Sequence, residues 1–165
     1  MRNHSWPLLS IAALGLALAA CGRPPAAPQA PEANATPAAN ALTAAPLPRS
    51  QSAAGASVAI LSPRSGDIVS SPVKVVFGLQ GMTLAPAGDP APNSGHHHLL
   101  VDVPAPDFGQ PIPKDEQHLH FGKAQTEVEL TLAPGPHTLQ LLLGDSNHVP
   151  HNPPLLSAPT TITVQ

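Results

Sequence analysis

Thr126-Glu127-Val128-Glu129-Leu130-Thr131-Leu132 is the stretch that decides the fold class, because apolar and polar side chains alternate along it without a break. Successive side chains of a β-strand point to opposite faces, so the apolar residues of this run face a core and the others face water. Pro134-Gly135-Pro136 then turns the chain into a second run, whose inward residues are Leu139, Leu141 and Leu143. The two runs predict consecutive strands, each with one buried face.

The same period of two extends over residues 57–165. It predicts further strands at Ser57–Leu61, Val73–Gln80, His96–Val103, His118–Phe121 and Thr160–Val164. No window shows a helical stripe longer than two turns, and the prolines of the connections exclude most helices. Seven short strands in about 110 residues indicate an all-β fold, an immunoglobulin-like antiparallel β-sandwich of about seven strands that lacks the usual cysteine pair and buried tryptophan.

The N-terminal residues resemble an export signal rather than part of this domain. Arg2 precedes an apolar run at 8–20 that is too short to span a bilayer. Leu18-Ala19-Ala20-Cys21 has the form of a bacterial lipobox, so we expect residues 1–20 to be a lipoprotein signal peptide and Cys21 to be the lipidated mature N-terminus. The alternative is a small apolar cysteine inside an ordinary signal peptide. Gly22 favours sorting to the outer membrane, facing the periplasm.

Residues 21–56 combine the lipidated cysteine with a segment rich in alanine and proline that has few charges and no apolar periodicity. Such a segment cannot bury enough surface to offset its ordering entropy, so we expect a disordered tether. The folded, histidine-rich domain is then predicted to occupy residues 57–165.

Composition excludes several classes of function. Seven Lys and Arg stand against ten Asp and Glu, with no cationic cluster, so nucleic-acid binding is not expected. Aromatic residues make up 2 % of the chain and tyrosine is absent, which leaves no stacking surface for carbohydrate. The single cysteine excludes an intramolecular disulfide, a cysteine-based zinc site and an iron–sulfur cluster.

Nine histidines in a chain with so few other charges are the unusual feature. Seven of the eight in residues 57–165 form three groups, at 96–98, at 118 and 120, and at 148 and 151. Residues i and i+2 of a strand share a face, so His96 and His98 lie side by side, as do His118 and His120. This spacing brings two imidazoles within reach of one ion.

The usual strand order of a sandwich places the three groups at one pole. We therefore predict a shared metal site whose candidate ligands are His96, His98, His118, His120, His148 and His151. His137 follows the opposite turn and is expected at the far end. His97 and His137 each head an apolar strand face and are interpreted as packing residues.

Imidazoles without thiolate or methionine ligands favour zinc or copper(II). Asp145 and Asn147 lie in the loop of His148 and could ligate the ion or orient a ring, and Asp102 shares the face of His98, where it is either such a group or a surface charge. We expect metal affinity to fall steeply between about pH 7 and about pH 5, because protons compete for imidazole. The alternative is that these histidines hydrogen-bond the backbone of a proline-rich pole and bind no metal.

Three blocks of sequence, Gly95–Asp102, His118–Thr126 and Leu141–His151, resemble the bacterial family known as domain of unknown function 4399. The resemblance covers nearly all of the folded domain and leaves out the lipobox and the tether. It implies a periplasmic or lipid-anchored β-sandwich module, and it supplies no established activity.

The sequence therefore predicts a non-enzymatic envelope lipoprotein, anchored in the membrane through Cys21, whose histidine-rich pole binds copper or zinc for storage, delivery or sensing. The second hypothesis is a non-catalytic interaction module of the cell envelope that grips a protein partner without physiological metal. A third is a metalloenzyme similar to copper–zinc superoxide dismutase, although the disulfide and the Gly-rich metal loop of those enzymes are missing.

Overall fold

The computed structural model describes residues 45–165. The predicted signal peptide, Cys21 and most of the predicted tether lie outside these described residues. No helix within residues 45–165 is long and apolar enough to cross a membrane.

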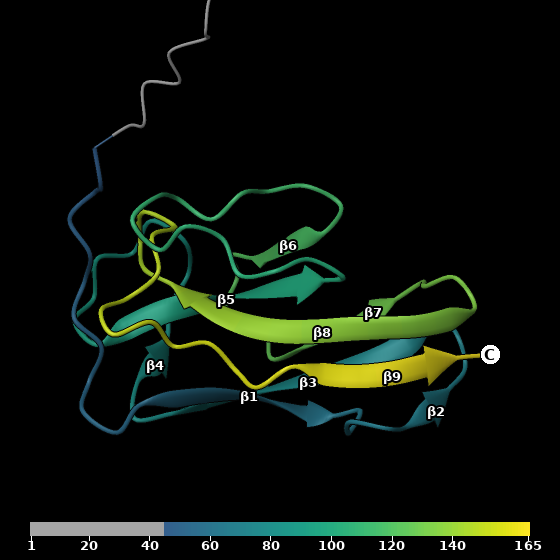
Figure 1. Cartoon of the computed structure of the whole chain (residues 1–165). Coiled ribbons are helices and arrows are strands. Elements are labelled where there is room, and N and C mark those ends of the chain that lie inside the picture. The colour runs from purple at the N-terminus through teal and green to yellow at the C-terminus, as the bar shows by residue number, and fades with distance from the viewer. Residues whose placement is uncertain (1–44) are drawn as a thin grey trace, which may run out of the picture. The chain divides into compact units, whose positions relative to one another are not determined.

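The described chain folds into two β-sheets (Figure 1). The smaller sheet is antiparallel, has the order β1-β3-β7 and consists of β1 (Ser57–Ser62), β3 (Val73–Gln80) and β7 (Glu127–Leu130). The larger sheet has the order β2-β9-β8-β5-β4, with β6 paired to β5; its strands are β2 (Ile68–Val69), β9 (Thr160–Val164), β8 (Gly135–Gly144), β5 (Ser94–Val101), β4 (Thr83–Leu84) and β6 (His118–Phe121).

These sheets confirm the predicted all-β, immunoglobulin-like sandwich. All seven strands expected from the alternation occur, and two-residue strands β2 and β4 are added at the sheet edges. The alternation shows only strands that bury a face, so two-residue edge strands leave no periodic signal.

The hydrophobic core lies between the sheets. Leu99 and Leu141, paired across β5 and β8, are fully buried and belong to the same cluster as Val75 and Phe77 of β3. His97 of β5 shares this inward face, with its ring edge-on to Phe77 at a centroid distance of 5.2 Å. Its Nδ1 lies 3.1 Å from the carbonyl oxygen of Gln125, so His97 lies in the core as a packing residue.

The outward face of β5 and of the adjoining end of β8 is also buried. Leu100 and Leu142 are fully buried but are not members of the core cluster. The connection from β5 to β6 (102–117) and the start of the connection from β8 to β9 (145–159) lie on the side of β5 and β8 away from β1 and β3 (Figure 1). The two connections are joined by a hydrogen bond of 2.8 Å from the Ile112 amide to the His148 carbonyl.

Residues 45–56, which the sequence assigned to the tether, also lie against the domain. The Leu47 amide donates to the Gly109 carbonyl at 2.8 Å, and the Ser52 amide donates to the Asn152 carbonyl at 3.1 Å. Ordered contacts therefore begin before residue 57. These contacts are backbone hydrogen bonds, which require no apolar periodicity and so are not visible in the sequence.

Candidate metal centre

Four histidines meet on the outward face of the larger sheet, beneath the two connections. In β5, His98 is opposite His120 of β6, and directly paired residues of antiparallel strands point to the same face. His96 lies two residues earlier on that face, and His148 reaches the group from the β8–β9 connection. We call His96, His98, His120 and His148 the His cluster.

The four rings are in mutual contact. All six ring-centroid separations lie between 4.8 and 5.9 Å. The Nε2 atoms of His96 and His98 are 3.1 Å apart, and those of His120 and His148 are 3.2 Å apart. Tetrahedral zinc–nitrogen bonds of 2.0–2.1 Å separate neighbouring ligand nitrogens by about 3.3 Å. One nitrogen from each of His96, His98 and His120 lies within 4.8 Å of the others, so small ring rotations would place them around one ion.

Two glycines provide the space that these rings occupy. A Cβ on Gly122 would lie 2.4 Å from Cε1 of His120, and a Cβ on Gly144 would lie 2.9 Å from Nε2 of His98. Gly144 is the residue paired with His96 across β5 and β8. Any side chain at either position would displace a ring of the His cluster.

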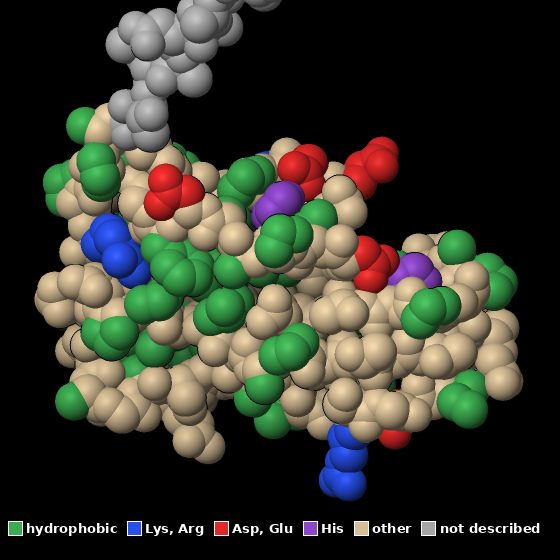
Figure 2. Space-filling view, viewed as in Figure 1, with side chains coloured by type: hydrophobic (Ala, Val, Ile, Leu, Met, Phe, Trp, Pro, Cys, Tyr) green, Lys and Arg blue, Asp and Glu red, His purple; other side chains and the backbone are tan. Residues whose placement is uncertain are grey.

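Burial keeps His96 and His98 neutral. His96 and His98 have no exposed surface. Burial, with the positive charge that His148 or His96 would carry, lowers the pKa of His96 to about 4 and that of His98 to about 2. Burial and neighbouring His148 also lower the pKa of His120. On the face of the molecule that Figure 2 shows, histidine side chains reach the surface only in small, separate patches.

The buried rings are not satisfied by hydrogen bonds within the described protein. Only one proton fits between the facing Nε2 atoms of His96 and His98. Each neutral ring carries one proton, so the ring that accepts this hydrogen bond carries its own proton on Nδ1. Both Nδ1 atoms are buried without a partner. A buried N–H group without an acceptor costs about 1–3 kcal/mol, so the metal-free arrangement is energetically unfavourable at this point.

His148 is held in place by Asp145, one of the residues predicted to support the site. Asp145 is 2 % exposed, and its Oδ1 accepts hydrogen bonds from the amides of Asn147 and Val149 at 2.9 and 3.0 Å. Its carbonyl accepts the His148 amide at 2.9 Å. Burial raises the pKa of this carboxyl, but the hydrogen bonds from Ser50, Val149 and Asn147 outweigh it and the net shift is downward.

The backbone of His148 has φ of 65°, in the left-handed region that few residues other than glycine adopt. The hydrogen bonds of Asp145 hold this conformation. Asp145 therefore orients the loop rather than a ring, and Asn147 contributes its backbone amide while its side chain is exposed.

Two predicted ligands lie outside the His cluster. Nδ1 of His118 is 2.8 Å from the Asp115 carboxylate, a hydrogen bond that lowers the pKa of Asp115. The buried ring of His151 faces two carbonyl oxygens, with Nε2 3.1 Å from Ser94 and Nδ1 3.4 Å from Leu143. The structure thus brings together four of the six predicted ligands, whereas the rings of His118 and His151 face other partners.

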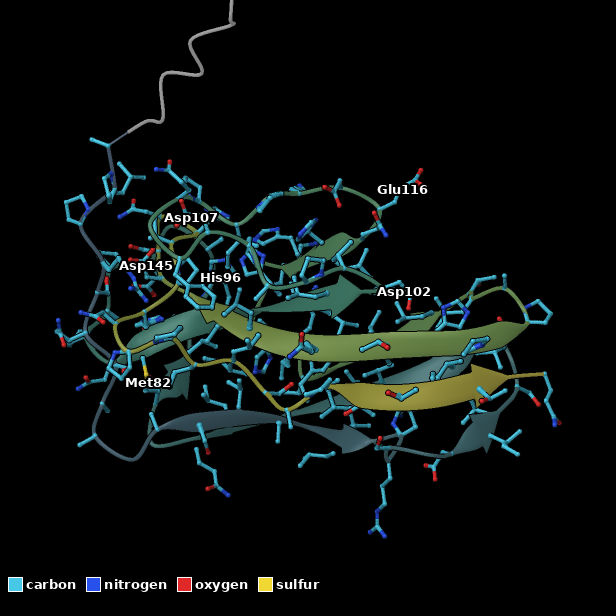
Figure 3. All side chains as sticks on the ribbon, in the orientation of Figure 1. Met82, His96, Asp102, Asp107, Glu116 and Asp145 are labelled. Atoms are coloured by element: carbon cyan, nitrogen blue, oxygen red, sulfur yellow. The ribbon has the colours of Figure 1, made fainter. Side chains whose placement is uncertain are left out.

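Asp102 and His137 form a separate pair. Nδ1 of His137 is 2.6 Å from Oδ2 of Asp102, whose Oδ1 accepts the Thr138 amide at 2.7 Å. The prediction that Asp102 orients a ligand ring therefore differs from the structure, in which its carboxylate binds His137. Figure 3 shows Asp102 apart from His96, whereas Asp145 and Asp107 lie on the side of His96.

Comparisons with known proteins give a family and a distant structural likeness. No curated protein matches the chain. The solved structure titled "Structures of Clostridium thermocellum CbhA fibronectin(III)-like modules" is similar with a TM-score of 0.36 and 14 % identity, over 66 % of this chain and 45 % of that chain. The family model described as Domain of unknown function (DUF4399) matches residues 75–165, which include the whole His cluster. The chain therefore belongs to this family, as its sequence blocks predicted.

Proposed function

We propose that this protein binds one divalent transition-metal ion, copper(II) or zinc, in the His cluster, and that it serves metal storage, delivery or sensing in the cell envelope. The observation that carries the proposal is the meeting of four buried or half-buried imidazoles from three segments of the chain, with their Nε2 atoms facing each other in pairs.

The donor set supports these metals. Neutral imidazole is a good ligand for zinc and copper(II), and the lowered pKa values keep His96 and His98 neutral at physiological pH. Cys21, the single cysteine, lies outside the described residues, and Met82 packs against the sandwich core.

The number of ligands supports binding rather than catalysis. Catalytic zinc sites keep one position open for water or substrate, whereas four protein ligands complete a tetrahedral site. The His cluster offers four imidazoles, so we propose a non-enzymatic role. A role in delivery would require an envelope partner that receives the metal.

The decisive measurement is the metal content of the full chain, purified without nickel resin and then exposed to copper(II) or zinc. We expect one bound ion per chain. His120→Ala should weaken binding strongly, while His118→Ala is the matched control, two residues away on β6 with its Nδ1 on Asp115. A wild-type chain that takes up no ion, or equal losses in the two variants, would favour the interaction-module hypothesis instead.

Anchoring through Cys21 is a second part of the proposal, supported by Leu18-Ala19-Ala20-Cys21 and by Gly22. Several acyl chains on one residue anchor a protein stably, since each buried methylene contributes about 0.8 kcal/mol. We expect Cys21→Ser to move the protein from the membrane fraction to the soluble periplasmic fraction and to abolish palmitate labelling. Unchanged partitioning of the variant would contradict the anchor.

A further inference from the structure

Residues 45–50, which we call the strap, contact both connections that cover the His cluster. On the β5–β6 side, the Leu47 amide donates to the Gly109 carbonyl at 2.8 Å. The Arg49 guanidinium lies over the Phe108 ring at 5.9 Å, within range of a cation–π interaction. The strap is thereby attached to the first covering connection.

The strap is also attached to the connection that carries His148. Arg49 donates from Nε to the Pro150 carbonyl at 2.9 Å, and from Nη2 to the carbonyl of His151. The Asn152 amide donates to the Ser50 carbonyl at 2.9 Å. One short segment thus ties together the two connections above the cluster.

The contact closest to the His cluster is made by Ser50. Its hydroxyl donates to Oδ2 of Asp145 at 2.7 Å, while Oδ1 of the same carboxylate holds the amides on either side of His148. Asp145 is buried, so its orientation depends on these few hydrogen bonds. A rotation of this carboxylate would release the left-handed backbone of His148.

We propose that the strap is part of the metal site: Ser50 and Arg49 are positioning residues that hold His148 in the His cluster, so docking of the strap sets the metal affinity. This inference rests on the proposed metal binding. The other three ligands belong to hydrogen-bonded strands β5 and β6, and His148 is the ligand that comes from a loop. Undocking the strap therefore leaves a weaker site of three histidines and provides a route for releasing the ion.

The test compares Ser50→Ala and Ser50→Thr in the full chain, with Ser52→Ala as the matched control. The Ser52 hydroxyl also donates to a carbonyl, that of Pro153 at 3.0 Å, but it does not contact Asp145. Loss of a hydrogen-bond partner of a ligand lowers metal affinity by about 10–100-fold. Ser50 acts one step further out, through Asp145, so we expect Ser50→Ala to lose about 10-fold in copper(II) affinity, at the lower end of this range. The paramagnetic resonance spectrum should change from four nitrogen ligands to three, and Ser50→Thr should restore both readouts.

Amide hydrogen exchange at Asn147 and Val149 in the metal-free chain separates the two proposals. Faster exchange in Ser50→Ala than in Ser52→Ala supports the strap as the element that holds the loop, even if the wild-type chain binds no copper and the proposed function fails. Wild-type copper affinity and spectrum in Ser50→Ala would overturn the inference while leaving the proposed function intact. Equal exchange in the two variants would also overturn it.

Discussion

The His cluster and the His137–Asp102 pair use the same side chain in opposite ways. In the cluster, two rings are fully buried, have Nδ1 atoms without partners and have a lowered pKa. In the pair, the ring is partly exposed and both nitrogens have partners, Asp102 and the Ala133 carbonyl at 2.9 Å. The hydrogen bond to Asp102 raises the pKa of His137.

The difference shows which histidines are available to a metal. A ring whose nitrogens already face a carboxylate and a carbonyl gains little from an ion, and its raised pKa favours the protonated form that cannot bind metal. Neutral rings that face one another have the opposite properties. The surroundings of each ring, rather than the number of histidines, therefore distinguish the candidate site from the structural pair.

The sharpest test of this comparison substitutes one histidine at each end. We expect His98→Ala to reduce copper(II) or zinc affinity by more than the roughly 100-fold that loss of an outer hydrogen-bond partner can cost, because a direct ligand is removed. His137→Ala should leave stoichiometry and affinity unchanged. Competition titration measures both, and circular dichroism checks that each variant is folded. Similar losses in the two variants would remove the basis of the comparison.

The features that the sequence predicted correctly follow from the regular geometry of a β-strand. Strict alternation in 126–132 and 139–143 is enough to place strands, and spacing i, i+2 is enough to put His96 beside His98. Such patterns identify which histidines share a face of a strand. They are also sufficient to recognise the family, since the three quoted blocks all lie within the matched residues.

The remaining features depend on contacts between distant residues. His118 and His151 have suitable spacing, but Asp115 and the Ser94 carbonyl orient their rings elsewhere. Ser50 is 95 residues from Asp145 in the sequence, and nothing in a proline-rich segment indicates that contact. Gly122 and Gly144 are similar: their role is visible only once the rings beside them are placed.

The second test concerns proton competition for the metal. A histidine at the reference pKa of about 6.5 loses about 25-fold in ligand availability between pH 7 and pH 5. His96 and His98, with pKa values of about 4 and about 2, remain neutral over this range and contribute almost none of that loss. The fall in metal affinity that the sequence predicts between pH 7 and pH 5 should therefore not come from His96 and His98.

We expect the logarithm of zinc affinity to change by no more than about two units per pH unit between pH 7 and pH 5, and to steepen only below pH 5. Zinc titrations with a competing chelator at several pH values measure this slope. A slope above two in that range would mean that His96 and His98 are protonated near neutral pH. That result would contradict the difference between the His cluster and His137.

The third expected effect is on the stability of the metal-free protein. For His96 and His98, the pKa in the folded state is below the unfolded value of about 6.5, so the unfolded chain binds more protons as pH falls below about 6.5. Stability should therefore fall between pH 7 and pH 4, by a few kcal/mol.

His137 acts in the opposite direction, because its raised pKa contributes stability below the unfolded pKa that is lost as pH rises through the folded value. Its partial exposure limits this contribution to about 1 kcal/mol or less. Denaturant unfolding at pH 7 and pH 4 should show a shallower acid loss in His98→Leu, which removes one buried titrating ring, and a steeper loss in Asp102→Asn, which removes the partner of His137. If both substitutions changed the acid loss in the same direction, the two ends of the molecule would not differ in the way their geometry requires.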